Sequence, residues 1–232
     1  MTTEAVEVSE KNLDDAEKAS LAIKRIGMIA LMAIGLGFFM QGLILTAKLA
    51  SGGSFPNITF LADLAQGVTW SFLVCSGVGI ATTLAKARAA LAGLISFIFA
   101  PIAVAVAKGS QKVMAGLLNA AEQPAVLSLA TVSTLRAIEY GLLGWLLATL
   151  IRKDESRAFP YIATGIAIGV IFGGAIVAIS YQVALGKGVA MGAPQLAGSL
   201  VNEIGSPIGC ALLIYIGQFV GRNVKILSAA KA

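Results

Sequence analysis

The chain has 232 residues, of which 57% are hydrophobic and only 12% are charged. Soluble domains carry about 25% charged residues, and a soluble chain of this length could not cover so much apolar side chain. The net charge of +5 does not indicate a nucleic-acid partner, because the basic residues stand singly or in small groups at the ends of apolar runs. The composition therefore predicts an all-α integral membrane protein whose surroundings are the lipid bilayer.

The residue types that are missing limit the chemistry. Histidine is absent, which removes the commonest general base near neutral pH and the commonest metal ligand. The two cysteines, Cys75 and Cys210, fall inside apolar runs, so we expect buried thiols rather than a disulfide framework. No spacing typical of a metal, nucleotide or haem site is present. We therefore expect no metal and no cofactor.

An acidic segment, residues 1–24, comes first and is expected to be cytoplasmic. We interpret it as a solvated leader with a short helix over 12–24; the alternative is an amphipathic segment that lies on the membrane or binds a partner. The apolar run that follows is too long for a cleavable signal peptide, so we expect it to be retained as a span.

Six apolar runs of membrane length, about 20 residues each, follow the leader. They form one transmembrane domain, 25–221, with expected spans at 26–47, 60–85, 89–107, 126–151, 159–181 and 196–220. Only residues 86–88 separate the second span from the third. We also predict a short surface helix over 113–121 that ends before Pro124, and a loop over the glycine-rich residues 186–194. A short basic tail, 222–232, ends the chain.

Lysine and arginine counts predict the orientation. With the N-terminus inside, the cytoplasmic side carries twelve basic residues: Lys11, Lys18, Lys24, Arg25, Lys86, Arg88, Arg152, Lys153, Arg157, Arg222, Lys225 and Lys231. The other side carries four: Lys48, Lys108, Lys112 and Lys187. Because cytoplasmic loops are enriched in basic residues, both termini are expected in the cytoplasm. Since no transit or retention signal is visible, we expect a bacterial inner (plasma) membrane.

Four charged residues lie inside the predicted spans, where each costs about 3 kcal/mol and is a functional candidate. Asp63 falls in the first turn of the second span and can favour the helix dipole there. Arg136 lies about 15 Å along the fourth span, with Glu139 and Tyr140 on the same face at spacings of three and four. That face cannot point at lipid.

Glu203 is the fourth candidate, in the sixth span beside Asn202. Pro207 has no N–H, so the carbonyl of Glu203 loses its helical partner, and we expect a weakened or broken helix over 202–209. Such breaks expose backbone carbonyls at transporter sites. If Arg136 pairs with one glutamate, the other is desolvated and neutral. This set either couples transport to a proton or cation, or only joins the fourth span to the sixth.

Glycines recur at four-residue spacing on two spans. Gly165, Gly169 and Gly173 share one face of the fifth span, and Gly205 and Gly209 share a face of the sixth. Small residues at this spacing let helices approach closely in a membrane. We expect packing within the chain; the alternative is an interface between subunits.

These observations favour a small ion or solute transporter or channel. Glu203 would be the protonatable or cation-binding group, and Arg136 a tuning charge or an anion clamp. The alternative is a structural or assembly subunit of a larger membrane complex, so a homo-oligomer or partner subunits stay open. The transporter predicts a water-accessible cavity at the cluster, whereas the subunit predicts a dry one. An enzyme is the least favoured class, because without histidine catalysis would have to use Glu203, Glu139 or Asp63, and none of them has a visible nucleophile partner.

Overall fold

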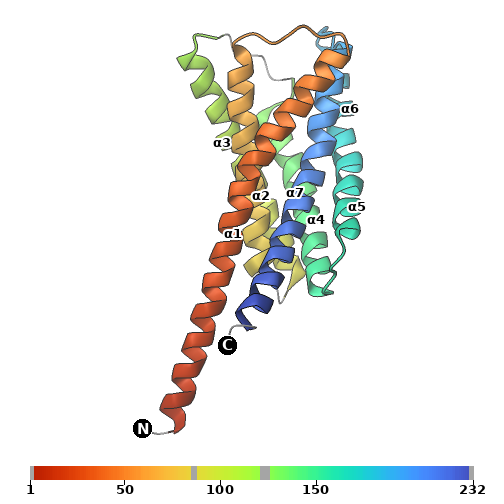
Figure 1. Cartoon of the computed structure of the whole chain (residues 1–232). Coiled ribbons are helices and arrows are strands. Elements are labelled where there is room, and N and C mark those ends of the chain that lie inside the picture. Colours follow the sequence, from red (N-terminus) through yellow and green to blue (C-terminus); the bar gives the residue numbers. More distant parts are fainter. Residues whose placement is uncertain (1–2, 85–87, 121–125, 230–232) are drawn as a thin grey trace.

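The structure is a computed structural model that describes residues 3–84, 88–120 and 126–229, with side chains for Ala16 and from Ala19 to Gly221 within those ranges. Within this part every regular element is helical: α1 (Thr3–Ala50), α2 (Thr59–Leu84), α3 (Ala89–Leu117), α4 (Leu129–Arg152), α5 (Ala158–Ile168), η1 (Gly169–Gly173), α6 (Gly174–Gly186) and α7 (Ala193–Ala229). Figure 1 shows them as one elongated bundle.

Six helical segments are long and apolar enough to cross a membrane: Ala19–Ala50, Thr59–Leu84, Ala89–Leu117, Leu129–Arg152, Ala158–Gly186 and Ala193–Gly221. The fifth of them joins α5, η1 and α6 into one continuous segment. Large apolar side chains, among them Phe38, Phe39, Phe97 and Ile171, are exposed along the outside of the bundle. A lipid environment accepts such a surface, whereas water does not.

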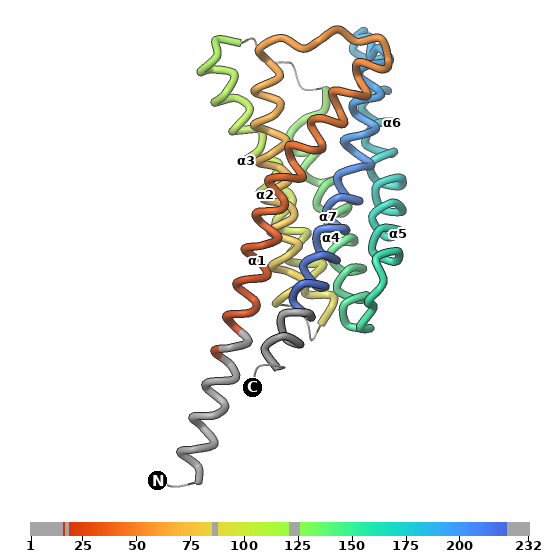
Figure 2. The backbone as a smooth tube through the Cα atoms, in the orientation of Figure 1, coloured from red at the N-terminus to blue at the C-terminus, as the bar shows by residue number. Residues whose placement is uncertain are grey.

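Helix α1 begins and α7 ends at the same end of the bundle (Figure 1). We call this the terminal end, and it also carries the α2–α3 and α4–α5 connections. The other end, with the connections 51–58, 118–128 and 187–192, we call the distal end. Helix α7 packs against α1 on one side and α5 on the other, and α3 packs between α2 and α4 (Figure 2).

Three helix boundaries differ from the sequence predictions. Helix α1 starts at Thr3, so helix extends through most of the acidic leader; the leader has no glycine or proline to stop it. The prediction of a separate surface helix over 113–121 was wrong, because α3 continues to Leu117. The break at Pro207 was also wrong, because this residue lies inside the continuous helix α7. Pro124 and most of the turn at 86–88 lie outside the described residues.

Close glycine contacts explain how α7 stays continuous at Pro207. A Cβ atom at Gly173 would lie 2.5 Å from the carbonyl oxygen of Glu203, and one at Gly169 would lie 2.6 Å from that of Ile204. The backbone of the fifth segment therefore covers the carbonyl that Pro207 leaves without a helical donor. Neighbouring helices commonly compensate proline in membrane helices in this way.

The other glycine face packs α7 against α1. A Cβ atom at Gly205 would lie 2.6 Å from the Met40 methyl group, and one at Gly209 would lie 2.7 Å from the Leu36 side chain. The structure thus places all five of these glycines in contacts within one chain.

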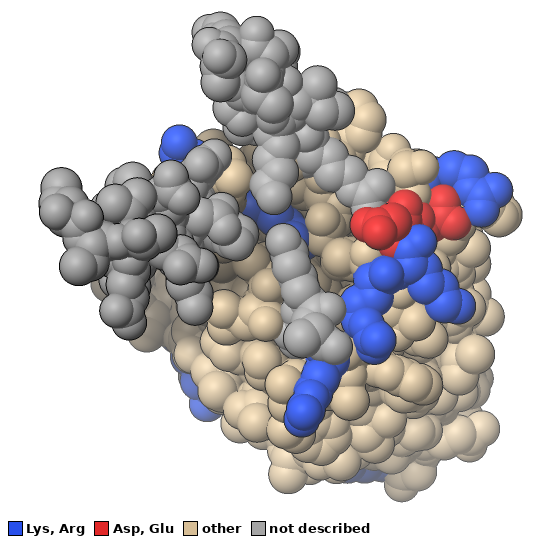
Figure 3. All heavy atoms as spheres, turned by 90° about the horizontal axis from the view of Figure 1, so that it is seen from below, with Lys and Arg blue, Asp and Glu red and all other residues tan. Residues whose placement is uncertain are grey.

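Basic side chains predominate on the terminal end (Figure 3). The α4–α5 connection there contributes the exposed residues Arg152, Lys153 and Arg157. Arg157 donates to both carboxylate oxygens of Glu155 at 2.9 Å, and these hydrogen bonds lower the pKa of Glu155 to about 2. The carboxylate is therefore ionised at neutral pH and keeps Arg157 beside it.

Candidate functional site

Arg136 is the centre of the buried polar cluster. It is the eighth residue of α4, about 10.5 Å from the start of that helix. Its Nη1 donates to Glu139 Oε2 at 2.6 Å, and its Nη2 forms an ion pair with Glu203 Oε2 from α7. Arg136 therefore lies between both glutamates and pairs with each of them. With both carboxylates ionised, the three charges sum to −1.

The two glutamates have different surroundings. Glu139 is completely buried, and its Oε1 has no hydrogen-bond partner in the part of the chain that the structure describes. The side chain of Glu203 keeps 13% of its surface exposed, and its Oε1 accepts a hydrogen bond from Asn202 Nδ2 at 3.0 Å. Glu203 is therefore the carboxylate that a solute can reach.

Trp70 from α2 packs its ring against the guanidinium of Arg136. The Arg136 Cζ atom lies 5.1 Å from the centroid of the Trp70 ring, within the range of a cation–π contact. The same ring meets Tyr140 edge to face at 5.4 Å. Tyr140 is fully buried and its hydroxyl has no partner among the described residues. It therefore packs behind the cluster rather than into an open site.

A cavity of about 430 Å³ leads to this cluster from the distal end. Glu203, Arg136, Asn202 and Trp70 line its floor. Polar side chains from four helices line its walls: Gln41, Lys48, Asp63, Gln66, Lys108, Gln111, Gln195 and Ser199. Ligand pockets commonly have volumes of about 300–1,000 Å³, so this cavity can hold a small solute with some water.

Asp63 belongs to the wall of this cavity. It is the fifth residue of α2, just beyond the first turn where the sequence placed it. Gln111 Nε2 donates to Asp63 Oδ1 at 2.8 Å, and Lys108 Nζ donates to Gln111 Oε1 at 2.8 Å. This chain of hydrogen bonds joins α2 to α3 at the mouth of the cavity.

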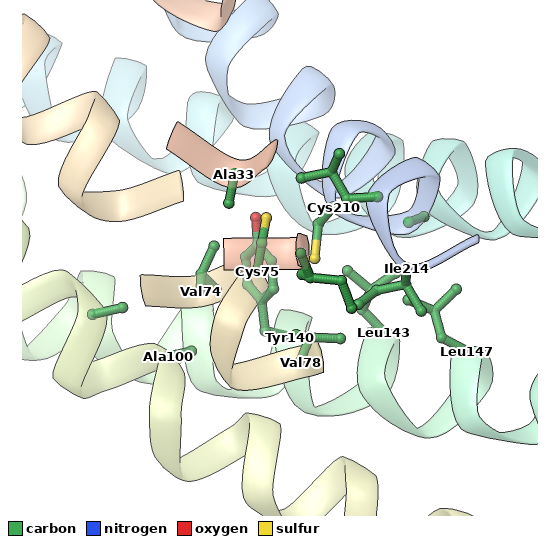
Figure 4. Close-up of a cluster of buried hydrophobic side chains, with 14 of the residues drawn as sticks. Ala33, Val74, Cys75, Val78, Ala100, Tyr140, Leu143, Leu147, Cys210 and Ile214 are labelled. Carbon is green, nitrogen blue, oxygen red and sulfur yellow. The ribbon is translucent and has the colours of Figure 1, made fainter. Parts of the chain in front are cut away.

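An apolar cluster closes the bundle between the cavity floor and the terminal end. Its buried members include Ile29, Val78, Leu143, Leu147 and Ile214. Figure 4 shows α2, α4 and α7 contributing side chains to this cluster, with Cys75 and Cys210 among them. Both thiols are free and buried, as expected from their apolar surroundings.

The structure adds a buried cation that the sequence argument missed. Arg25 was counted as a cytoplasmic loop charge, but it is only 8% exposed. Its Nη2 donates to Thr82 at 3.4 Å. The Gln218 amide, turned so that its oxygen faces the guanidinium, accepts from Nη2 at 2.6 Å and from Nη1 at 2.9 Å. This contact ties α1, α2 and α7 together near the terminal end.

No group of acidic or cysteine side chains suited to a metal ion occurs among the described residues. No protein-family model, curated protein or solved structure matches this chain. The site itself therefore carries the functional argument.

Proposed function

We propose that the chain is a small membrane transporter that binds a polar solute or ion at Glu203 and Arg136. Both termini would face the cytoplasm, and the membrane would be a bacterial inner membrane. The observation that carries the proposal is the cavity of about 430 Å³ that reaches this buried ion pair from the distal end.

The cavity supports transport over a purely structural role. Two helices joined only by an ion pair do not need a hydrophilic approach to it, and an enclosed, fully paired cluster would meet that need better. Here the approach is lined by side chains that can replace a solute's water shell, such as Gln41, Gln66 and Ser199. Polar and charged groups inside a membrane segment typically mark solute pathways.

The arrangement resembles one state of an alternating-access cycle. The cavity leads to the distal end, while the apolar cluster and Arg25 close the terminal end. Transport would require the terminal end to open, which means parting Arg25 from Thr82 and Gln218. The fifth segment is a natural element to move, because η1 is a π-helical turn packed directly against Glu203.

The roles of the cluster residues follow from their exposure. Glu203 faces the cavity and would contact the solute or a coupling cation. Arg136 would hold the Glu203 carboxylate in place, and Glu139 would fix Arg136 from the buried side. Asn202 would orient Glu203 Oε1, the oxygen that does not pair with Arg136, through the hydrogen bond at 3.0 Å. Tyr140 would support the Trp70 ring.

Flux into proteoliposomes tests the proposal. Purified protein would be reconstituted and given a defined mixture of amino acids, sugars, amines and organic acids, and the lumenal contents would be identified by mass spectrometry. We expect at least one solute to enter faster than into empty liposomes. We also expect Glu203→Gln to slow its entry at least about tenfold, as the loss of one charged contact does.

A matched variant keeps the result interpretable. Glu155→Gln removes a carboxylate from the terminal surface, far from the cavity, and should leave the flux unchanged. If no solute enters and the wild type co-purifies with other membrane subunits, the structural-subunit alternative replaces transport. Equal flux through wild type and Glu203→Gln would remove Glu203 from the pathway.

A further inference from the structure

The charges that face the cavity are separated by depth. Arg136 and Glu203 line the floor, and Glu139 is buried behind them; with both carboxylates ionised, these three residues carry one surplus negative charge. The mouth holds Lys48, Lys108 and Asp63, which together carry one surplus positive charge. The cluster at the floor is thus negative, whereas the mouth is positive.

Lys48 defines the positive end. Its side chain lies across α7, because a Cβ atom at Gly198 would be 2.8 Å from the Lys48 Cε atom. Helix α7 starts at Ala193, only five residues earlier, so the positive end of its dipole lies at the same level. Among the residues that the structure describes, no carboxylate forms an ion pair with the Lys48 ammonium. An anionic group is the natural partner at this position.

Glu203 defines the negative end. Arg136 is shared between two carboxylates, so it cannot neutralise both. A surplus negative charge in a membrane segment is costly unless a cation joins it. Glu203 is the carboxylate of the cluster that lines the cavity, and a cationic group of the solute can reach it there.

The spacing of the two ends sets the size of the solute. Gly198, under the Lys48 side chain, and Glu203 are five residues apart on α7, or about 7.5 Å along the helix. Both residues line the cavity of about 430 Å³, so one small molecule with a cationic and an anionic group can contact the two ends together.

We propose that the cavity binds a small zwitterion, with its ammonium group at Glu203 and its anionic group at Lys48. This inference rests on the proposed function for its site, but binding alone tests it. The same pair of charges occurs in free amino acids and in ethanolamine phosphate headgroups of lipids, so both sources enter the test.

Three compounds of equal length separate the contributions of the two ends. Binding of 4-aminobutanoate, butylamine and butanoate would be measured by calorimetry on the protein in nanodiscs of phosphatidylglycerol. We expect 4-aminobutanoate to bind at least about tenfold more tightly than either singly charged analogue, as one extra charged contact provides. Equal affinity for 4-aminobutanoate and butylamine would overturn the inference, and so would the absence of binding by 4-aminobutanoate, glycine and β-alanine alike.

Variants identify the end that each group occupies. Lys48→Met should abolish the preference for 4-aminobutanoate over butylamine while leaving butylamine binding intact. Glu203→Gln should weaken both ligands. Lys24→Met, an exposed lysine at the terminal end, should change neither and serves as the control. A Lys48→Met protein that still prefers the zwitterion contradicts the assignment of the anionic group.

Further results show whether the ligand is a lipid headgroup or a free solute. They also separate failure of the zwitterion site from failure of the transport proposal. Competition by phosphatidylethanolamine in the nanodisc supports the zwitterion site and identifies a lipid headgroup as its occupant; no competition supports a free solute. Binding of 4-aminobutanoate without flux keeps the zwitterion site and removes transport. Flux of a singly charged solute, with no zwitterion bound, keeps transport and removes this inference.

Discussion

Arg136 is the residue that joins the other members of the buried cluster. It is 5% exposed and lies between Glu139 and Glu203, with Trp70 against its guanidinium. Two carboxylates at this depth can stay ionised only while a cation is shared between them. The Arg136 guanidinium therefore fixes the geometry of the cavity floor and lowers the free-energy cost of burying the two carboxylates.

Arg136→Gln should destabilise the protein by about 3–5 kcal/mol, because it leaves buried charge without a partner. The measurement is thermal unfolding of the protein in lipid nanodiscs at neutral pH. Arg157→Gln is the control, because it breaks an ion pair that is exposed at the surface and should leave the unfolding temperature unchanged. Comparable losses for both variants would mean that the buried cluster contributes no more than a surface pair.

Individual site residues were predictable where a charge interrupts an apolar run. Arg136, Glu139 and Glu203 were named on this ground, and the structure brings them together. Arg25 was missed because it stands at the edge of its run beside Lys24, where a loop charge is equally expected. The only signal was the polar pair of Thr82 and Gln218 on other spans. Contacts between distant segments do not follow from helical spacing.

At the scale of elements, the fifth segment and α7 form the most closely fitted pair. Gly173 lies against the carbonyl of Glu203, whereas a Cβ atom at the next residue, Gly174, would meet nothing within 4 Å. These two adjacent glycines therefore face different surroundings, and they provide a matched pair of positions.

Gly173→Ala should destabilise the protein by about 1–3 kcal/mol, because its methyl group overlaps backbone that cannot move aside easily. Gly174→Ala should be neutral or slightly stabilising, since alanine is the better helix former. Thermal unfolding in nanodiscs measures both, and binding of a solute that requires Glu203 should weaken only in the Gly173 variant. Equal stability of the two variants would contradict the close packing of η1 on α7.

The number and order of the six spans were predicted, because the length of an apolar run is set by membrane thickness. The third span was predicted to end at residue 107, but its helix continues to Leu117. The two errors in helix continuity have a common cause. Pro207 and the end of α3 were assigned from local propensity alone, without the neighbouring helices that stabilise them. The π-helical turn at Gly169–Gly173 has no sequence signal distinct from the glycine repeat that contains it.

The whole molecule has two chemically different ends. The terminal end carries Lys24, Arg88, Arg152, Lys153 and Arg157 on its exposed surface, and α1 begins and α7 ends there (Figure 1). The distal end carries the mouth of the cavity and fewer basic residues. A bilayer that is negative on its cytoplasmic face should therefore hold the terminal end inside, and the cavity should open to the outside.

Cysteine labelling in intact cells checks this orientation. The background is the double variant Cys75→Ala and Cys210→Ala, which removes two buried thiols. Into it we would place Ser54→Cys, exposed on the distal connection, or Ser156→Cys, exposed on the α4–α5 connection. A membrane-impermeant maleimide should label Ser54→Cys in intact cells and Ser156→Cys only after permeabilisation. The reverse pattern would place the cavity on the cytoplasmic side, and labelling of both in intact cells would contradict a single orientation.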